Sequence, residues 1–312
     1  MRHLIDRRDF LKSSTLVAGL GVLGGASLTS LFAGTKPQKF IAGLAPGTRG
    51  TVESFWEICD ACSALGFHYI ETDNTRLQIV EAYKDRTAEF QEEMAKRNLT
   101  MAGFVQLSFF ADPAKREETI EQNMRIGRFL EAVGGDYIAA SFEIRHIPGY
   151  EGRDAYELLQ EEDFRRFARL ADEVGKRLRE ETGIKFGYHP HSPVGFPRIM
   201  DLTNPDYFHL VPDLGHLARG GLDPLRVCRA YRSRIMTVHL KDYDPNLEYE
   251  FRGRRGKGRT VVLGSGTIDF PAVVDFLKET EFTGWVHGEH GSNPQDFPAM
   301  KAYMVDQLGL HL

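Results

Sequence analysis

The sequence predicts a single closed barrel of eight parallel β-strands surrounded by α-helices. After residue 39, eight short apolar runs alternate with longer amphipathic segments, which is the pattern of repeated strand-helix units. Such barrels commonly have roughly 250 residues, and this chain of 312 residues contains no linker or low-complexity run that would divide it. An open doubly wound sheet is disfavoured, because GLAPG after the first strand lacks the spacing of a glycine-rich phosphate turn.

Each predicted strand is a short apolar run bounded by turn-forming or polar residues. In chain order, the runs are residues 40–44, 67–71, 100–107, 137–142, 184–189, 208–212, 235–240 and 285–289. The intervening segments have helical spacing, as Phe164, Phe167 and Ala171 illustrate with steps of three and four residues. Glycines stand where helices are expected to end before the next strand, at Gly66, Gly134 and Gly183.

The first 34 residues predict an export signal. The paired arginines of DRRDFLK at 6–12 precede LVAGLGVL at 16–23, which is uncharged and built of small or apolar residues. This pattern looks like a twin-arginine signal, and it is too rich in Gly, Ser and Thr for a span, which needs roughly 20 strongly apolar residues. We therefore expect residues 1–34 to be removed, leaving a barrel of residues 35–312 in the periplasm or otherwise exported, with no stable membrane span.

The composition of the mature chain limits its partners. Removal of residues 1–34 takes away four of the 39 basic and two of the 44 acidic side chains, which leaves a net charge of −7. Because proteins hold nucleic acid mainly through accumulated Lys and Arg, this balance argues against a nucleic-acid partner. Three cysteines cannot form a complete disulfide framework, and the helical spacing around Cys59 and Cys62 favours a buried helix face over a redox motif.

Potential metal ligands follow each of the last four predicted strands. The carboxyl ends of parallel barrel strands meet at one rim, so residues far apart in the sequence become neighbours there. The four strand ends supply, in order, His189 with His191, Asp213 with His216, His239 with Lys241, and Glu289. One such histidine alone is more often a satisfied structural residue, but the set predicts a mixed nitrogen and oxygen site for Mn, Co, Zn or Mg.

Five segments carry a resemblance to a known family. They are GIKFGYHPH at 183–191, PDLGH at 212–216, VHLKD at 238–242, LGSGTIDF at 263–270 and GWVHGE at 284–289. Their order and spacing resemble the xylose isomerase-like TIM-barrel superfamily, which includes sugar phosphate isomerases and epimerases, inosose dehydratases and, more distantly, endonuclease IV. The resemblance, over residues 40–308, implies a (β/α)8 barrel with a divalent metal held by His189, Asp213, His239 and Glu289. It also implies that His216 contacts substrate.

The chain departs from the epimerases at the fifth strand. Where they carry a Glu that is both ligand and base, this chain has His189, and a neutral imidazole does not supply the same carboxylate base. The resemblance still implies α-proton abstraction from a carbohydrate or polyol ketone through a metal-stabilised enediolate. In that reaction Glu289 would be the principal base, His191 a proton donor and Lys241 the cation that neutralises the oxyanion.

Several reactions are compatible with one metal and one carboxylate. Sugar isomerisation or epimerisation is the first expectation, and an inosose-type dehydratase or a keto-sugar lyase is the alternative. A non-catalytic sugar-binding protein on the same barrel is less favoured, because it would not need the His, Asp, His and Glu set. An endonuclease IV-like enzyme is also less favoured, since it needs more ligands and a broad basic face. An oligomer is compatible with the sequence.

Three more polar residues are expected near the same rim. Glu71 after the second strand, Gln106 in the third and Glu143 after the fourth are predicted to bind substrate hydroxyls or to add a ligand, although each equally suits a structural hydrogen-bonding role. The longest predicted loop, 242–267, contains RGRRGKGR at 252–259. Two interpretations are open for its five cations: they belong to a solvated loop and balance acidic neighbours, or they form an anion site.

Overall fold

The structure, a computed structural model, describes residues 36–48, 50–73, 76–142, 159–192, 195–251, 254–291 and 293–312. The export signal predicted for residues 1–34, the candidate Glu143, and Arg252 with Gly253 lie outside these described residues. The fold belongs to the unit Lys36–Leu312. None of the helices in the described ranges combines the length and the apolar character that a membrane crossing requires.

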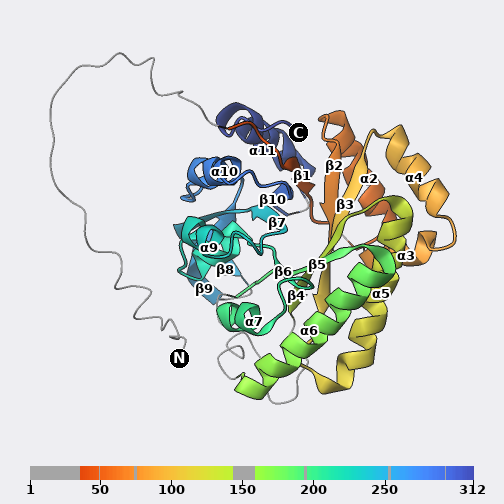
Figure 1. The fold of residues 1–312 in the computed structure, drawn as a ribbon. Coiled ribbons are helices and arrows are strands. Elements are labelled where there is room, and N and C mark those ends of the chain that lie inside the picture. The colour runs from red at the N-terminus through yellow and green to blue at the C-terminus, as the bar shows by residue number, and fades with distance from the viewer. Residues whose placement is uncertain are drawn as a thin grey trace, which may run out of the picture. The chain divides into compact units, whose positions relative to one another are not determined.

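Eight parallel strands form the predicted barrel (Figure 1). Its strands are β1 Ile41–Ala45, β2 Tyr69–Thr72, β3 Thr100–Ser108, β4 Tyr137–Phe142, β5 Lys185–Tyr188, β6 His209–Leu210, β7 Thr237–Leu240 and β10 Trp285–Glu289. Neighbours follow the order β6-β5-β4-β3-β2-β1-β10-β7. Two isolated parallel bridges, Leu210 with Ile235 and Asp213 with His239, join the two ends of this order. The predicted fold class is therefore confirmed.

Helices cover the outside of the barrel, as Figure 1 shows for α4, α5 and α6 beside β2 to β5. Their bounds are α2 Val52–Ala64, α3 Arg76–Tyr83, α4 Thr87–Lys96, α5 Arg116–Val133, α6 Glu161–Thr182, α7 Phe196–Leu202, α8 Leu214–Arg219, α9 Pro224–Ala230, α10 Phe270–Glu279 and α11 Phe297–Ala302. Short 3-10 helices lie at η1 Pro113–Lys115 and η3 Pro294–Asp296, and a short π-helix lies at η4 Tyr303–Gln307. Gly134 and Gly183 end α5 and α6 in the left-handed conformation, with φ of 84° and 73°, which residues with a Cβ rarely adopt.

The segment predicted as the longest loop is instead an antiparallel ribbon. It consists of β8 Asp242–Phe251 and β9 Arg254–Val261, directly after β7. The pairing places acidic residues opposite cationic ones, with Asp244 across from Arg259 and Glu248 across from Lys257. Opposite charges in facing positions stabilise a strand pair, so this register favours the interpretation in which the cations balance acidic neighbours.

Two apolar clusters set the position of the polar rim. The larger one lies between strands and helices and includes Phe90, Phe104 and Phe167, together with Cys59 and Cys62, which are buried in α2 as the helical spacing predicts. The smaller cluster consists of Ala102, Tyr137, Ala139, Val211, Met236 and Trp285. Its members come from strands, or from residues beside them, on several sides of the barrel, so they fill the barrel interior and leave the carboxyl ends of the strands for polar side chains.

Candidate active site

Four side chains from different strands converge at the carboxyl rim of the barrel. His189 follows β5, Asp213 follows β6, His239 lies in β7 and Glu289 ends β10. Each offers one ligand atom, and these atoms all lie within 4.8 Å of one another. His189 Nε2 is 3.1 Å from His239 Nδ1 and 3.4 Å from Asp213 Oδ2. The structure thus brings together the four residues that the sequence singled out as metal ligands.

The two oxygens of Asp213 face different partners. Oδ1 accepts the backbone N–H of His216 at 2.8 Å and thereby caps the start of α8, which fixes the side chain in place. Oδ2 is then left to face His189 and Lys241, at 3.4 and 2.9 Å. Burial opposes ionisation, but His216 and Lys241 hold the pKa of Asp213 well below its ordinary value, so the group is a carboxylate.

Glu289 is divided between two neighbours in the same way. Its Oε2 lies 2.8 Å from His239 Nδ1, on the side of the candidate ligands. Its Oε1 lies 2.5 Å from Lys241 Nζ. Burial opposes the charge, yet the ammonium of Lys241 lowers the pKa of Glu289. One oxygen is therefore available as a ligand while the other, still ionised, faces a cation.

A buried carboxylate holds His239 in place from behind. The two oxygens of Glu71 lie 3.1 and 3.2 Å from His239 Nε2, and one of them also accepts the hydroxyl of Tyr137. A carboxylate in this position keeps the proton on Nε2 and leaves Nδ1 free to bind a metal. Glu71, predicted to bind substrate or add a ligand, is placed here as a support for His239.

His189 has a corresponding support on its far side. Ser141, at the end of β4, lies with its hydroxyl 3.0 Å from His189 Nδ1 and 3.2 Å from His191 Nε2. With Nδ1 engaged there, Nε2 of His189 points to the candidate ligands. Neither Ser141 nor Tyr137 stood out in the sequence, because a single hydroxyl in an apolar strand has no spacing that indicates its partner.

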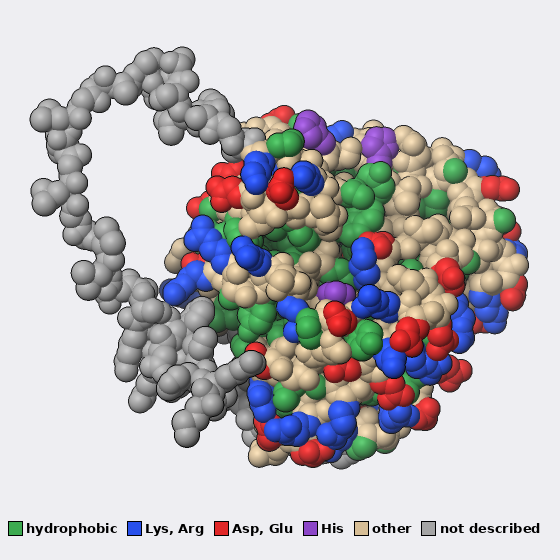
Figure 2. Space-filling view, in the orientation of Figure 1, with side chains coloured by type: hydrophobic (Ala, Val, Ile, Leu, Met, Phe, Trp, Pro, Cys, Tyr) green, Lys and Arg blue, Asp and Glu red, His purple; other side chains and the backbone are tan. Residues whose placement is uncertain are grey.

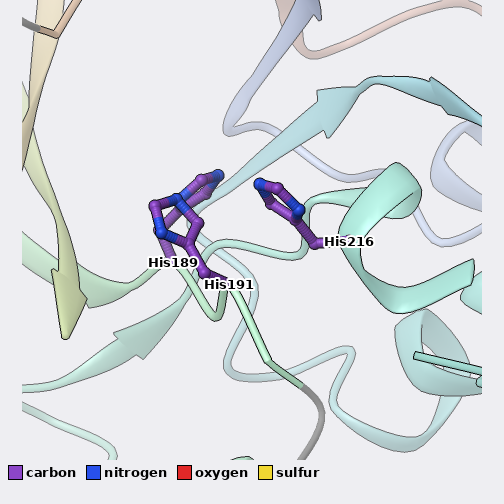
Figure 3. Close-up of side chains that lie close together, drawn as sticks. All are labelled: His189, His191 and His216. Atoms are coloured by element: carbon purple, nitrogen blue, oxygen red, sulfur yellow. The ribbon is translucent and has the colours of Figure 1, made fainter. Parts of the chain in front are cut away.

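Three histidine rings form a second group beside the four ligands (Figure 3). His189 and His191 come from the segment after β5, and His216 comes from α8; the ring centroids of His191 and His216 are 4.6 Å apart. Lys241 Nζ lies 3.3 Å from His216 Nε2, so this nitrogen serves as an acceptor for the ammonium. Burial is the main reason that the pKa values of both His191 and His216 fall well below the ordinary histidine value. Both rings are therefore neutral.

Two of the candidate ligands, His189 and Glu289, line a cavity of about 450 Å³, which is within the usual range for small-molecule sites. It is lined by Ala45, Pro46, Gly47, Glu71, Thr72, Asp73, Arg76, Val105, Leu107, His189, His191, Lys241, Glu289 and Gly291. The side chain of Gln106, by contrast, is hydrogen-bonded to other protein groups: its oxygen accepts from Arg76, and its amide donates to Leu107 O and to Gln122. Gln106 thus orients Arg76, a cavity residue that the sequence did not single out.

The chemistry of this centre fits a divalent cation. Asp213 Oδ2 and Glu289 Oε2 are buried oxygens for which the described residues supply no donor in hydrogen-bond geometry, although positively charged groups lie close by. Uncompensated buried oxygens are costly, and an ion that takes both, together with two imidazole nitrogens, would remove that cost. Two nitrogen and two oxygen donors suit Zn, Mn or Co, and also Mg when water completes its shell.

Charged side chains intermingle on the described face drawn in Figure 2. Basic and acidic groups lie next to one another over this face. Ion pairs between exposed side chains among the described residues include Arg116 with Glu173 and Arg177 with Glu181. A mixed surface of this kind keeps a protein soluble without attracting a polyanion. The rim differs from this surface, because the candidate ligands and Lys241 gather there around a cavity.

Comparison with known proteins agrees with this architecture. The family model of the xylose isomerase-like TIM barrel matches residues 59–304. Inosose dehydratase 1 of Bacillus cereus is 28% identical over 284 residues, which cover 84% of this chain and 92% of that protein.

Two solved structures share the fold. The IOLI protein with a binding zinc atom has a TM-score of 0.64 at 18% identity, over 86% of this chain and 98% of that chain. A xylose isomerase-like TIM barrel protein from Mycobacterium smegmatis in complex with magnesium has a TM-score of 0.63 at 15% identity, over 85% and 96%. Because the family model spans most of the described unit, from α2 to η4, this chain belongs to the xylose isomerase-like TIM barrel family.

Proposed function

We propose that the protein is a metal-dependent enzyme that removes a proton next to the carbonyl of a polyol ketone and then expels a β-hydroxyl as water. The observation that carries this proposal is the division of Glu289, with Oε2 facing the other candidate ligands and Oε1 facing Lys241. A carboxylate placed in this way can hold an ion and act as a base in the same site. The similarity to inosose dehydratase 1 supports dehydration as the outcome.

His189, Asp213, His239 and Glu289 would hold the ion. A bound divalent ion supplies a Lewis acid that polarises the substrate carbonyl and so acidifies the neighbouring C–H group. The protein supplies the remaining steps through its own side chains, all of which lie in or beside the cavity.

The proton route follows from the charges in the cavity. Glu289 Oε1 accepts the α-proton, and the electron pair of the broken C–H bond forms the enol double bond. Lys241 Nζ stays charged, since Asp213 and Glu289, against the effect of burial, raise its pKa above the ordinary lysine value. The ammonium can therefore stabilise the developing oxyanion.

The same proton can leave with the hydroxyl. When the β C–O bond breaks, Glu289 returns the proton to the departing oxygen, so that the net change is the loss of one water molecule. His191 is neutral in this structure, because burial lowers its pKa, so it acts as a hydrogen-bond donor to that oxygen and not as an imidazolium acid.

Isomerisation or epimerisation, the first expectation from the sequence, is the second candidate. The close contact of Glu289 Oε1 with Lys241 Nζ, at 2.5 Å, favours it, because an enediolate stabilised by the ammonium can persist until Glu289 returns a proton to a neighbouring carbon. The substitution of His189 for the epimerase carboxylate weighs against inversion by two opposed carboxylates.

Exchange in deuterium oxide tests the proposal. Metal-loaded protein is incubated with an inosose and with linear keto sugars, and solvent deuterium at the α-carbon is followed by NMR while enone absorbance is followed over time. We expect deuterium incorporation with growth of the enone band. Deuterium incorporation without an enone would support isomerisation or epimerisation. Binding of the ketone with neither signal would instead indicate a non-catalytic sugar-binding protein.

Two substitutions connect this result to the site. Glu289→Gln should abolish exchange while the fold is kept, because the amide of Gln has no basic oxygen. His189→Ala should lower the metal content measured by atomic absorption, because it removes one of four ligands. Normal turnover in both variants would show that the chemistry occurs elsewhere.

A further inference from the structure

We propose that Arg76 recognises an anionic substituent, a carboxylate or a phosphate, on the substrate of this cavity. Arg76 is the first residue of α3 and lines the same cavity as His191, Lys241 and Glu289. Arg76 is only 9% exposed. The identity of the remaining part of the substrate, a polyol ketone, rests on the proposed function.

The guanidinium of Arg76 is hydrogen-bonded to neutral acceptors. Its Nε donates to the side-chain oxygen of Gln106, and its Nη1 donates to the backbone oxygen of Asp73 at 3.0 Å. The Asp73 carboxylate accepts the backbone N–H of Thr48, at 3.3 Å, and its charge only partly offsets the burial that lowers the pKa of Arg76. Burying a guanidinium without a closely paired anion is unfavourable, so the position calls for a partner beyond the contacts that the described residues provide.

A structural arginine of the same protein shows what full satisfaction looks like. Arg234, which is half-buried, donates from Nε, Nη1 and Nη2 to the backbone oxygens of Phe208 and Met200 and to the hydroxyl of Thr203. All three of its nitrogens are engaged. For Arg76 Nη2, the described residues supply no acceptor, so donors of its planar fork are left to face the cavity.

The orientation of Arg76 is fixed in advance. Gln106 is 1% exposed, and its amide donates to Leu107 O at 2.7 Å and to Gln122 Oε1 at 3.1 Å. Gln122 in turn donates to Glu118 Oε1 at 3.0 Å on the same helix, α5. A guanidinium aligned by such a chain loses little side-chain entropy when it binds an anion. This organisation distinguishes Arg76 from a solvated surface arginine.

The charges of the cavity leave room for this anion. Four carboxylates face or support it, namely Glu71, Asp73, Asp213 and Glu289, and two cations accompany them, Arg76 and Lys241. With a divalent ion bound, these charges sum to zero. Lys241 already contacts Asp213 and Glu289, so Arg76 is the cation of the described cavity that remains for an acidic group on the substrate.

Equilibrium binding tests this proposal without relying on turnover. Zinc-loaded full-length protein is titrated calorimetrically with D-glucuronate, D-glucose 6-phosphate and neutral D-glucose. We expect at least one of the two anions to bind about ten- to a hundredfold more tightly than glucose, the range expected for one charge-assisted contact. Comparison of the two anions separates a carboxylate from a phosphate. Equal affinity for all three compounds would overturn the proposal.

Variants assign the preference to Arg76. Arg76→Gln should bring the affinity for the preferred anion to within about threefold of that for glucose, while Arg76→Lys should keep part of the preference. Arg86→Gln is the matched control, because Arg86 is exposed and pairs with Glu89 outside the cavity. If Arg76→Gln does not fold, Gln106→Glu decides, since a carboxylate at that position would neutralise Arg76 and should abolish the preference. An unchanged preference in the folded variants would refute the assignment.

Exchange with a neutral ketone separates this proposal from the proposed function. Metal-loaded wild type and the Arg86→Gln control should incorporate deuterium into an inosose at rates within about threefold of each other, because Arg86 lies at the surface and pairs with Glu89. If wild type shows no exchange with any ketone, the proposed function fails, and the binding titrations still decide whether Arg76 binds an anion.

Discussion

Replacement of Glu71 by Gln should weaken metal binding although Glu71 is not expected to touch the ion. The carboxylate lies 3.1 and 3.2 Å from His239 Nε2 and keeps the proton on that nitrogen. An amide in its place can turn its NH2 group toward the ring and favour the tautomer with a proton on Nδ1, which cannot bind metal. Loss of such a support typically costs about 10- to 100-fold in metal affinity.

The same substitution should also destabilise the metal-free protein. Burial opposes the charge of Glu71, but His239 lowers its pKa from 4.5 to about 2; burial likewise opposes protonation of His239, but Glu71 and Glu289 raise its pKa from 6.5 to about 10. The two shifts describe one ion pair and are counted once. The smaller of them corresponds to about 3 kcal/mol as an upper limit.

The pH dependence of this loss has a definite sign. Because the folded-state pKa of Glu71 is lowered, its contribution is complete above pH 4.5 and is lost as the pH falls toward 2. Because the folded-state pKa of His239 is raised, the contribution of the pair is complete below pH 6.5 and is lost as the pH rises through 10. The stability difference between wild type and Glu71→Gln should therefore be largest between pH 4.5 and 6.5.

The assay combines metal titration with urea unfolding. Calorimetric titration with zinc and with manganese gives the affinity, and urea unfolding of EDTA-treated protein at about pH 5.5 and about pH 9 gives the stability. Glu81→Gln is the control, because this exposed residue pairs with Lys84 at the surface, where such a pair contributes less than about 1 kcal/mol. A Glu71→Gln protein with wild-type metal affinity and no difference in stability at either pH would refute the reasoning.

Three further predictions concern packing, acid stability and location. Gly175 lies in α6, where a Cβ would meet Tyr207 O at 2.1 Å, so Gly175→Ala should lower the free energy of unfolding by about 1–3 kcal/mol. A higher free energy of unfolding, measured in urea, would contradict this. Burial lowers the pKa of His209 from 6.5 to about 4, so stability that is present above pH 6.5 should be lost as the pH falls toward 4. His209→Gln should reduce the slope of the unfolding free energy against pH in this range. An unchanged slope would contradict the prediction. We also propose that residues 1–34 direct export, so replacement of Arg7 and Arg8 by Lys should retain the protein in the cytoplasm, which cell fractionation checks; undiminished periplasmic protein would speak against the signal.

The strands of the barrel were predictable because their pattern is local. Each of the eight runs is apolar over a length typical of a buried parallel strand, and the observed strands end within two residues of the predicted bounds. The convergence of His189, Asp213, His239 and Glu289 was predictable for a geometric reason, since each stands at the carboxyl end of a strand. Their roles in binding and catalysis remain proposals.

The remaining features depend on contacts between distant residues. β8 alternates apolar residues, Tyr243, Leu247, Tyr249 and Phe251, with polar ones, but Pro245 interrupts this pattern. Its partner β9 is built mainly of Arg, Lys and Gly, so the strand pair was missed in the sequence. Arg76 follows β2 without any motif, and its orientation depends on Gln106 in β3 and on the backbone oxygen of Asp73. Glu71 was recognised, but whether its carboxylate faces substrate or His239 is decided by the packing of the barrel.

The seam between β6 and β7 gives the candidate centre a mechanical consequence. This seam consists of isolated bridges, one of which joins Asp213 to His239, whereas β3 and β4 share a ladder of six residue pairs. The same two residues offer ligand atoms on either side of it, so a bound ion would cross-link the two ends of the strand order. Removal of the ion with EDTA should therefore speed amide hydrogen exchange at residues 209–213 and 235–239 more than at β3 and β4. Uniform acceleration would show that the seam does not depend on the ion.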